Sequence, residues 1–183
     1  MCKYGITGGI GSGKSYVCRR LEARGIQVYD CDAAAKRLLH TSTELQQQLI
    51  ALVGSLDKAA ISRFLLADEA NQQAINAIIH PAVFRDFQES GYRWMESAIL
   101  FESGADSLVD RVVVVTAPEE LRIQRIMQRD NISRSQARQW LCRQWPQRRI
   151  RDLADFEIVN DGIADIDAQL DRLLLQHQWP CAG

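Results

Sequence analysis

A glycine-rich stretch near the N-terminus reads Gly8-Gly9-Ile10-Gly11-Ser12-Gly13-Lys14-Ser15. It matches the pattern GxxxxGK[ST], whose glycines let the backbone curl until consecutive N–H groups point at phosphate oxygens. The helix that follows in this pattern adds unpaired N-terminal amides and the positive end of its dipole. Lys14 adds a point charge near the β- and γ-phosphates, and the Ser15 hydroxyl can ligate Mg²⁺. The stretch predicts a nucleoside-triphosphate site, with a chance glycine-rich turn as the alternative.

The segments on either side of the stretch provide the context that the pattern needs. Tyr4–Thr7 is a short apolar run typical of a strand, and residues 14–24 have the apolar stripe of a helix. We therefore expect ATP to bind here, with Mg²⁺ reaching Ser15 through the nucleotide. The residues expected to contact ATP are Gly9, Ile10, Gly11, Ser12, Gly13, Lys14, Ser15 and Tyr16.

Short apolar runs alternate with helical patterns along the rest of the chain. Strands are expected at residues 4–7, 26–29, 94–101, 111–116 and 156–160. Helices are expected at residues 14–24, 33–39, 44–52, 58–66, 71–87 with an interruption at Pro81, after Pro118, from Ser133 to about Trp145, and at residues 166–176. This order predicts an α/β fold with a mainly parallel sheet flanked by helices.

Composition sets limits on the class of protein. The 183 residues are 46% hydrophobic and 25% charged, as in ordinary globular proteins. With a net charge of −1, we expect the protein to bind neither nucleic acid nor an acidic membrane surface. No run approaches the roughly 20 apolar residues that span a bilayer, and the N-terminus does not read as a signal peptide. The five cysteines are scattered and include no CxxC pair, so we expect neither a metal site nor a disulfide framework. This pattern favours a reducing, cytoplasmic setting.

Two carboxylates, Asp30 and Asp32, follow the expected strand at residues 26–29. Open α/β sheets bind ligands at the carboxyl ends of their strands. One carboxylate can accept the proton of an attacking hydroxyl, while the other orients it or holds water around Mg²⁺. Alternatively, Asp32 caps a helix that begins at Ala33, and the two roles can coexist.

Three arginines, Arg122, Arg125 and Arg129, have a spacing that puts them on one helix face. Such a face is usually solvated. A protein that transfers phosphoryl groups must also neutralise developing negative charge, and arginines do this where water is excluded. Of the three, we expect Arg125 to act in catalysis.

The other polar candidates have two interpretations each. His80 before Pro81 either shapes an acceptor pocket or is a structural histidine, and Glu102 either contacts the acceptor or Mg²⁺ through water or simply ends a strand. Residues 143–151 carry four arginines around Trp145. They fit a lid over ATP phosphates as well as an exposed basic helix, whereas the near-neutral chain argues against an RNA-binding patch.

Further short stretches combine with the glycine-rich stretch into a longer pattern. They are Asp30-Cys31-Asp32, Asn76-Ala77-Ile78-Ile79-His80-Pro81, Ile99-Leu100-Phe101-Glu102, Gln128-Arg129-Asp130, and Ala154-Asp155 with Asn160. Together with residues 5–15 they resemble the dephospho-coenzyme A (dephospho-CoA) kinase family. The resemblance runs over nearly the whole chain and is far more specific than the phosphate loop alone.

The resemblance implies a P-loop kinase that transfers the ATP γ-phosphoryl group to the ribose 3′-hydroxyl of dephospho-CoA, the last step of coenzyme A biosynthesis. Its parts would be a core at about residues 1–32, 91–130 and 152–183, a helical acceptor subdomain at about 33–90, and a lid at about 131–151. Asp32 matches the proposed general base and Arg125 an arginine that contacts the transferring phosphates, with Lys14 as the third catalytic residue. The residues expected near the acceptor are Asp30, Asp32, His80 and Glu102.

Some positions depart from the family pattern, and other functions stay open. Tyr16 replaces a small residue after the loop, Lys58 stands where arginine is common, and Ala98 where proline usually precedes the Leu-Leu pair. A shikimate- or nucleoside-monophosphate-type kinase is the second interpretation, because a strand-end Asp-x-Asp also occurs in shikimate-type enzymes. A nucleotide-binding regulatory module is the third. We expect a monomer.

Overall fold

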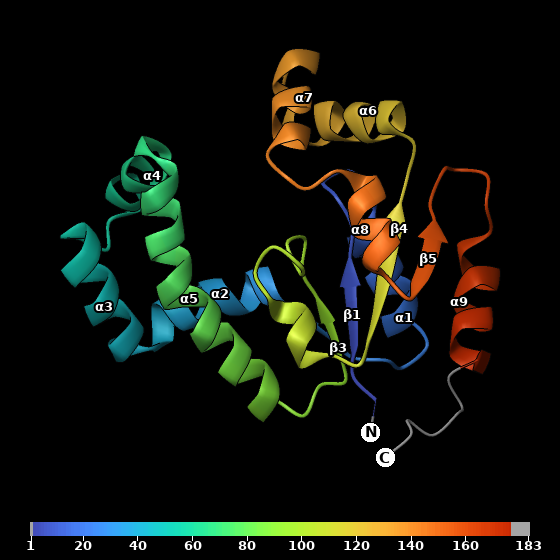
Figure 1. The fold of residues 1–183 in the computed structure, drawn as a ribbon, viewed down its shortest axis with the longest axis horizontal. Coiled ribbons are helices and arrows are strands. Elements are labelled where there is room, and N and C mark those ends of the chain that lie inside the picture. Colours follow the sequence, from blue (N-terminus) through green and yellow to red (C-terminus); the bar gives the residue numbers. More distant parts are fainter. Residues whose placement is uncertain (1, 177–183) are drawn as a thin grey trace. The chain divides into compact units, whose positions relative to one another are not determined.

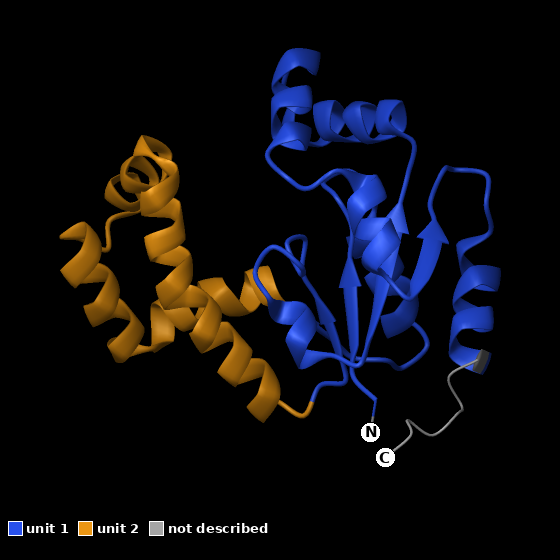
Figure 2. Ribbon diagram, in the orientation of Figure 1, with its two compact units in different colours: residues 1–29, 92–183 blue, residues 30–91 orange. Residues whose placement is uncertain are grey.

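The computed structural model describes residues 2–176, which form two compact units. One unit contains the residues up to Tyr29 and from Tyr92 onward, and the other is Asp30–Gly91 (Figure 2). The first is an α/β unit and the second is helical.

The α/β unit is organised around a five-stranded sheet (Figure 1). The strands are β1 (Tyr4–Thr7), β2 (Val28–Asp30), β3 (Trp94–Glu96), β4 (Arg111–Thr116) and β5 (Phe156–Val159). Their order in the sheet is β2-β3-β1-β4-β5, and β1 pairs in parallel with both β3 and β4. The predicted parallel α/β fold is confirmed, and the strand that precedes the glycine-rich stretch lies in the middle of the sheet.

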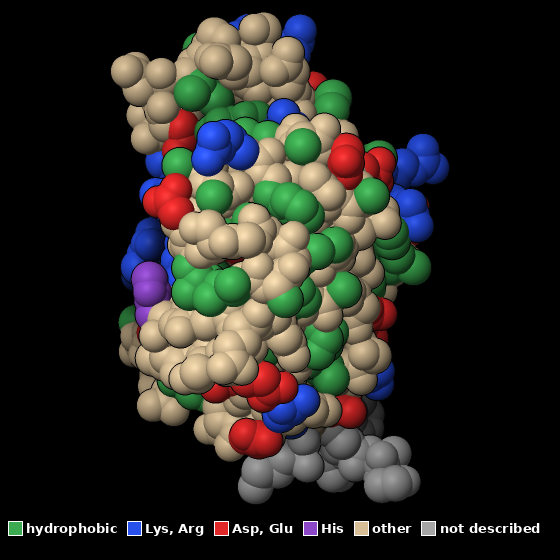
Figure 3. Space-filling model, turned by 90° about the vertical axis from the view of Figure 1, so that its left-hand side faces the viewer, with side chains coloured by type: hydrophobic (Ala, Val, Ile, Leu, Met, Phe, Trp, Pro, Cys, Tyr) green, Lys and Arg blue, Asp and Glu red, His purple; other side chains and the backbone are tan. Residues whose placement is uncertain are grey.

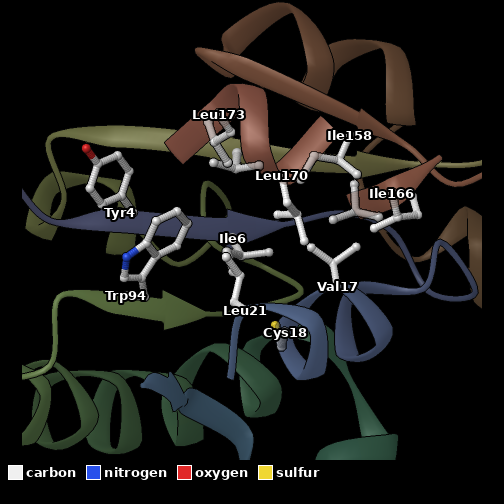
Figure 4. Close-up of a cluster of buried hydrophobic side chains, with 12 residues drawn as sticks. Tyr4, Ile6, Val17, Cys18, Leu21, Trp94, Ile158, Ile166, Leu170 and Leu173 are labelled. Atoms are coloured by element: carbon white, nitrogen blue, oxygen red, sulfur yellow. The ribbon is translucent and has the colours of Figure 1, made fainter. Parts of the chain in front are cut away.

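One face of the sheet is covered by helices α1 (Lys14–Glu22) and α9 (Ile166–Gln176). Figure 4 shows Leu21 of α1 and Leu170 of α9 reaching toward Ile6 of β1, and all three side chains are fully buried. Fully burying an aliphatic side chain of this size contributes about 1.5–3 kcal/mol. This packing fixes the start of α1, and with it the end of the glycine-rich loop.

Three further helices complete the described part of this unit: α6 (Glu119–Asp130), α7 (Arg134–Cys142) and α8 (Gln147–Leu153), with a 3-10 turn at Ala105–Leu108. Figure 1 shows α6 and α7 beyond the carboxyl ends of β1 and β4. Ile123, Ile126 and Ala137 join these two helices in a small buried cluster of their own. Helix α8 contacts β4, and its Ile150 is fully buried.

The helical unit contains α2 (Cys31–Thr41), α3 (Thr43–Val53), α4 (Lys58–Ala67) and α5 (Glu69–Glu89). Each begins after a side chain that accepts a hydrogen bond from the backbone N–H three residues later, which satisfies an otherwise unpaired donor. The capping residues are Asp30, Ser42, Asp57 and Asp68. Helix α5 contacts the other three, so it is the central element of this unit.

Three of the expected elements differ most from those observed. The strand expected at residues 94–101 ends at Glu96, and turns follow, with Leu100 fully buried among them. Helix α5 continues through Pro81, because buried side chains before and after the proline, at Ile75 and Val83, hold both halves in place. The helix expected to reach Trp145 ends at Cys142, and α8 is a separate helix.

Three expectations from composition concern surface charge, the cysteines and membrane-spanning helices. The face drawn in Figure 3 carries both basic and acidic side chains. Cys18, Cys31 and Cys142 form no disulfide, whereas Cys2 is disulfide-bonded, which differs from the expectation that the cysteines form no disulfide framework. Among residues 2–176, no helix is long and apolar enough to cross a bilayer.

Candidate active site

The candidate site is the loop between β1 and α1, at residues 8–13, as the glycine pattern predicts. The backbone N–H groups of Gly11, Gly13 and Ser15 have no acceptor within the described part of the chain. Unpaired amides at the start of a helix and in a curled loop are donors for an anion. The loop therefore presents several donors of the kind that bind phosphate oxygens.

Gly13 shows why this turn requires glycine. Its φ of 94° lies in the left-handed region, and a Cβ there would be 2.0 Å from Asn160 Nδ2. Asn160 is buried at 9% exposure, and its Nδ2 donates to Ser12 O at 2.8 Å. A side chain at position 13 would displace this amide, so the glycine allows Asn160 to hold the loop.

Lys14 is buried at 9% exposure at the first position of α1. Its Nζ donates to Gly8 O at 2.7 Å and lies 3.9 Å from Glu96 Oε1. Glu96 ends β3 and is paired in register with Ile6 of β1, which carries the carboxylate to the edge of the sheet where the loop begins. The sequence analysis missed Glu96, because the expected strand ran past it.

Arg122 supports the loop from α6 and is not a solvated side chain. It is 6% exposed, and its Nε donates to Ile10 O at 2.9 Å. Its Nη2 would lie 2.2 Å from a Cβ on Gly9, which shows how closely the guanidinium approaches the loop backbone. Burial lowers the pKa of Arg122, and Glu119 acts in the opposite direction. The solvated-face interpretation is wrong for this arginine.

Arg125 also contacts the loop from α6. Its Nη1 donates to Gly11 O at 3.3 Å and Ser12 O at 3.2 Å, and its Nη2 donates to Asn160 Oδ1 at 3.3 Å. Arg129 is exposed and forms an ion pair with Asp130. Of the three arginines on this face, Arg122 and Arg125 lie against the loop and Arg129 does not.

The hydroxyl groups near the loop differ in their surroundings. Ser12 Oγ and Thr7 Oγ1 are buried and have no hydrogen-bond partner among residues 2–176. Ser15 is exposed in the first turn of α1, and Tyr16 beside it is 43% exposed. Among those same residues no group of three or more His, Cys, Asp or Glu side chains could hold a metal ion.

Glu102 contacts the segment between α7 and α8. Its Oε1 accepts from Trp145 N at 3.2 Å, while its Oε2 is buried with no partner in the described residues. The neighbouring Gln144 accepts from Ile10 N at 2.7 Å, and Arg149 stacks 3.2 Å from the centre of the Trp145 ring. The sequence analysis missed Gln144, because nothing in the spacing of the segment separates it from other polar residues there.

Comparison with known protein families establishes the family to which this chain belongs. The model of the family described as dephospho-CoA kinase matches residues 3–165. The chain belongs to the dephospho-CoA kinase family.

Relatives agree with this assignment. A dephospho-CoA kinase of Bacteroides fragilis is 38% identical over 186 aligned residues, which cover 94% of this chain and 91% of that protein. One of Porphyromonas gingivalis is 44% identical over 176 residues, covering 87% of this chain and 86% of that protein. A solved structure from Thermus thermophilus has a TM-score of 0.84 at 30% identity and covers 98% of both chains. A shikimate kinase of Acinetobacter baumannii, at 17% identity and a TM-score of 0.58, covers 96% of this chain and 92% of its own and shares the fold.

The acidic pair that resembles the Asp-Ala-Asp of dephospho-CoA kinases lies at the start of the helical unit. Asp30 Oδ1 accepts from Ala33 N at 2.9 Å, so Asp30 is the N-cap of α2. Asp32 lies in the first turn of α2, is exposed, and has no hydrogen-bond partner in the described part of the chain. The capping role considered for Asp32 belongs to Asp30 instead, because α2 begins two residues earlier than expected.

His80 lies inside α5 of the helical unit. Its ring stacks on Phe84 with the centroids 5.9 Å apart, and burial lowers the pKa of the imidazole below its ordinary value. The same unit contains a cavity of about 310 Å³, partly open to solvent and lined by residues of α2, α3 and α5, including Pro81. His80 is therefore a half-buried neutral side chain next to a residue that lines this cavity.

Proposed function

We propose that this chain transfers the γ-phosphoryl group of ATP to the ribose 3′-hydroxyl of dephospho-CoA. The observation that carries the proposal is the set of unpaired N–H groups at Gly11, Gly13 and Ser15, beside a buried lysine, in a chain of this family. Donors fixed before the substrate arrives stabilise phosphate charge without reorganising in the transition state.

The loop residues would bind the triphosphate first. Phosphate oxygens would accept from the unpaired amides, and Lys14 would exchange Gly8 O for the β- and γ-phosphates. Mg²⁺, bound through the nucleotide and Ser15, would neutralise charge between these two phosphates. Arg125 is half-buried beside the loop and would turn part of its guanidinium toward the transferring group.

The reacting hydroxyl needs a group that accepts its proton. As its oxygen bonds to the γ-phosphorus, the bond from that phosphorus to the β,γ-bridging oxygen breaks and ADP leaves. We assign the proton to Asp32, because this carboxylate is exposed and has no partner among residues 2–176, whereas Asp30 is committed to the cap. A free carboxylate acts as a general base more readily than one that already accepts a backbone hydrogen bond.

The remaining assignments concern the acceptor and the setting. The cavity of about 310 Å³ in Asp30–Gly91 supports an acceptor-binding role for this unit, with His80 shaping the pocket. Glu102 is assigned to the acceptor side, and its unpartnered Oε2 is the atom available for such a contact. Residues 131–151 would act as a lid. We further propose a monomeric, cytoplasmic enzyme.

A coupled ADP-release assay tests the activity. Purified protein is expected to release ADP with dephospho-CoA and not with shikimate or nucleoside monophosphates. ADP release with shikimate instead would replace this function by the second interpretation. ATP binding without transfer to any acceptor would favour a regulatory module.

Asp32→Asn tests the assigned base. General-base catalysis contributes about 10²–10⁴-fold, so turnover should fall by that factor while ATP still binds. Glu69→Gln is the matched control, because Glu69 is also an acid in the first turn of a helix of the same unit, and its turnover should stay unchanged. Near-normal turnover of Asp32→Asn would remove Asp32 from this role.

A further inference from the structure

The segment between α7 and α8 is attached to the phosphate loop by one side chain. Gln144 Oε1 accepts from Ile10 N at 2.7 Å, across 134 residues of sequence. The next residue, Trp145, donates its backbone N–H to Glu102 at 3.2 Å. Two hydrogen bonds from adjacent residues fix the position and direction of this segment beside the loop.

The NH₂ group of the Gln144 side chain is an oriented donor without an acceptor among the described residues. With Oε1 bound to Ile10, the NH₂ group on the same carbon is oriented, since the amide is planar. Its Nε2 has no acceptor in residues 2–176, and the side chain is half-buried. Nε2 is not one of the buried atoms without a partner, so it can donate to water or to an oxygen of a ligand.

The position of Ile10 in the loop indicates which part of a nucleotide this donor would meet. Lysines of this loop type reach the β- and γ-phosphates. Lys14 Nζ donates to Gly8 O at 2.7 Å, so residues 8–10 would lie next to the terminal phosphates of a bound nucleotide. Arg122 Nε donates to Ile10 O at 2.9 Å, and this hydrogen bond helps to fix residues 8–10 beside Gln144.

We propose that Gln144 is a specificity-determining residue that donates from Nε2 to an oxygen of the γ-phosphate and thereby favours ATP over ADP. The inference rests on the proposed function, because it assumes that a triphosphate binds in the loop. Gln144 takes no proton and forms no bond to phosphorus. Its contribution is one hydrogen bond to a charged oxygen, made only when a third phosphate is present.

Two variants separate the donor from the anchor. Gln144→Glu keeps an oxygen for Ile10 N–H and removes the NH₂ donor, with an added negative charge. Gln144→Met removes donor and oxygen acceptor without adding charge. A hydrogen bond to a charged group contributes about 1.5–3 kcal/mol, so both variants should weaken ATP binding about 10- to 100-fold. ADP binding should change much less, because ADP has no γ-phosphate.

Calorimetric titration of the full chain with ATP and with ADP, in the presence of Mg²⁺ and without acceptor, measures the ratio of the two dissociation constants. Gln169 provides the matched control: it lies in α9, and its Oε1 accepts from Val159 N at 2.8 Å. Gln169→Glu and Gln169→Met should leave the ATP-to-ADP ratio as in the unmodified chain.

The outcomes are distinct. If ATP and ADP affinity fall equally in both Gln144 variants, Gln144 is a purely structural anchor and the proposal is overturned. It is also overturned if neither affinity changes. Should Gln144→Glu fail to fold in a thermal melt, Gln144→Met decides alone. A lost preference for ATP in a protein whose unmodified form releases no ADP with dephospho-CoA would leave this inference standing and refute the proposed acceptor.

Discussion

Placing a methyl group on Gly13 should damage the phosphate loop in two separable ways. The residue has φ of 94°, and its new Cβ would lie 2.0 Å from Asn160 Nδ2. The left-handed backbone costs a non-glycine residue about 1–2 kcal/mol. The contact forces Asn160 to release Ser12 O, a bond of 2.8 Å, and weakens its bond with Arg125, which together cost about 1–2 kcal/mol.

The sum for Gly13→Ala is about 2–4 kcal/mol, which corresponds to a Tm lowered by about 4–16 °C in a domain of this size. Gly25 offers a matched control, because its φ is 78° and a Cβ there meets nothing within 4 Å. Gly25→Ala should therefore cost only the backbone part, about 1–2 kcal/mol. The difference between the two variants isolates the contact with Asn160.

Chemical denaturation of Gly13→Ala, Asn160→Ala and the double variant forms the decisive cycle. Removing the Asn160 side chain makes room for the methyl group, so the double variant should be more stable than the sum of the single effects predicts, by about 1–2 kcal/mol. Additive effects, or equal losses at Gly13 and Gly25, would refute the idea that the two side chains compete for one space. ATP affinity should fall with Gly13→Ala and not with Gly25→Ala.

Two further predictions concern the helical unit. Burial lowers the pKa of His80 in the folded protein below the ordinary value of 6.5, so below pH 6.5 the unfolded chain binds more protons at this residue than the folded one. Stability should therefore fall as pH drops from 6.5 toward the folded-state pKa. His80→Gln should remove this part of the pH dependence in thermal melts at about pH 5 and 8. Asp30→Ala should cost about 1 kcal/mol through loss of the α2 cap while Asp30→Ser retains most of it. Equal melting temperatures for Asp30→Ala and Asp30→Ser would contradict the capping role.

Local patterns predicted the architecture and the loop, because each depends on residues close in sequence. The GxxxxGK[ST] stretch fixes a strand, a turn and a helix within about 20 residues, and the run at Arg111–Thr116 is apolar enough for a central strand. The apolar run at residues 94–101 misled, because burial of Leu100 in a turn leaves the same signature as burial in a strand.

The contacts that hold the loop could not be predicted from spacing. The spacing of Arg122, Arg125 and Arg129 places all three on one helix face and does not distinguish them. Only the approach of α6 to the loop makes Arg122 buried, while Arg129 is exposed. Gln144 and Glu96 reach the loop across long stretches of sequence. The cap of α2 was expected at Asp32 and lies at Asp30, because the start of α2 was misplaced by two residues, a common error at helix ends.

The bond between Ser12 and Asn160 joins positions 148 residues apart, and this has a consequence for synthesis on the ribosome. At about 5–20 residues per second, the ribosome needs about 7–30 s to advance from the first position to the second. Asp30–Gly91 is an uninterrupted stretch of neighbouring helices, so we expect it to fold early in this interval. The nascent chain would carry a finished helical body well before the sheet acquires β5 and before α9 covers it, and the nucleotide-binding half would be the last part to mature.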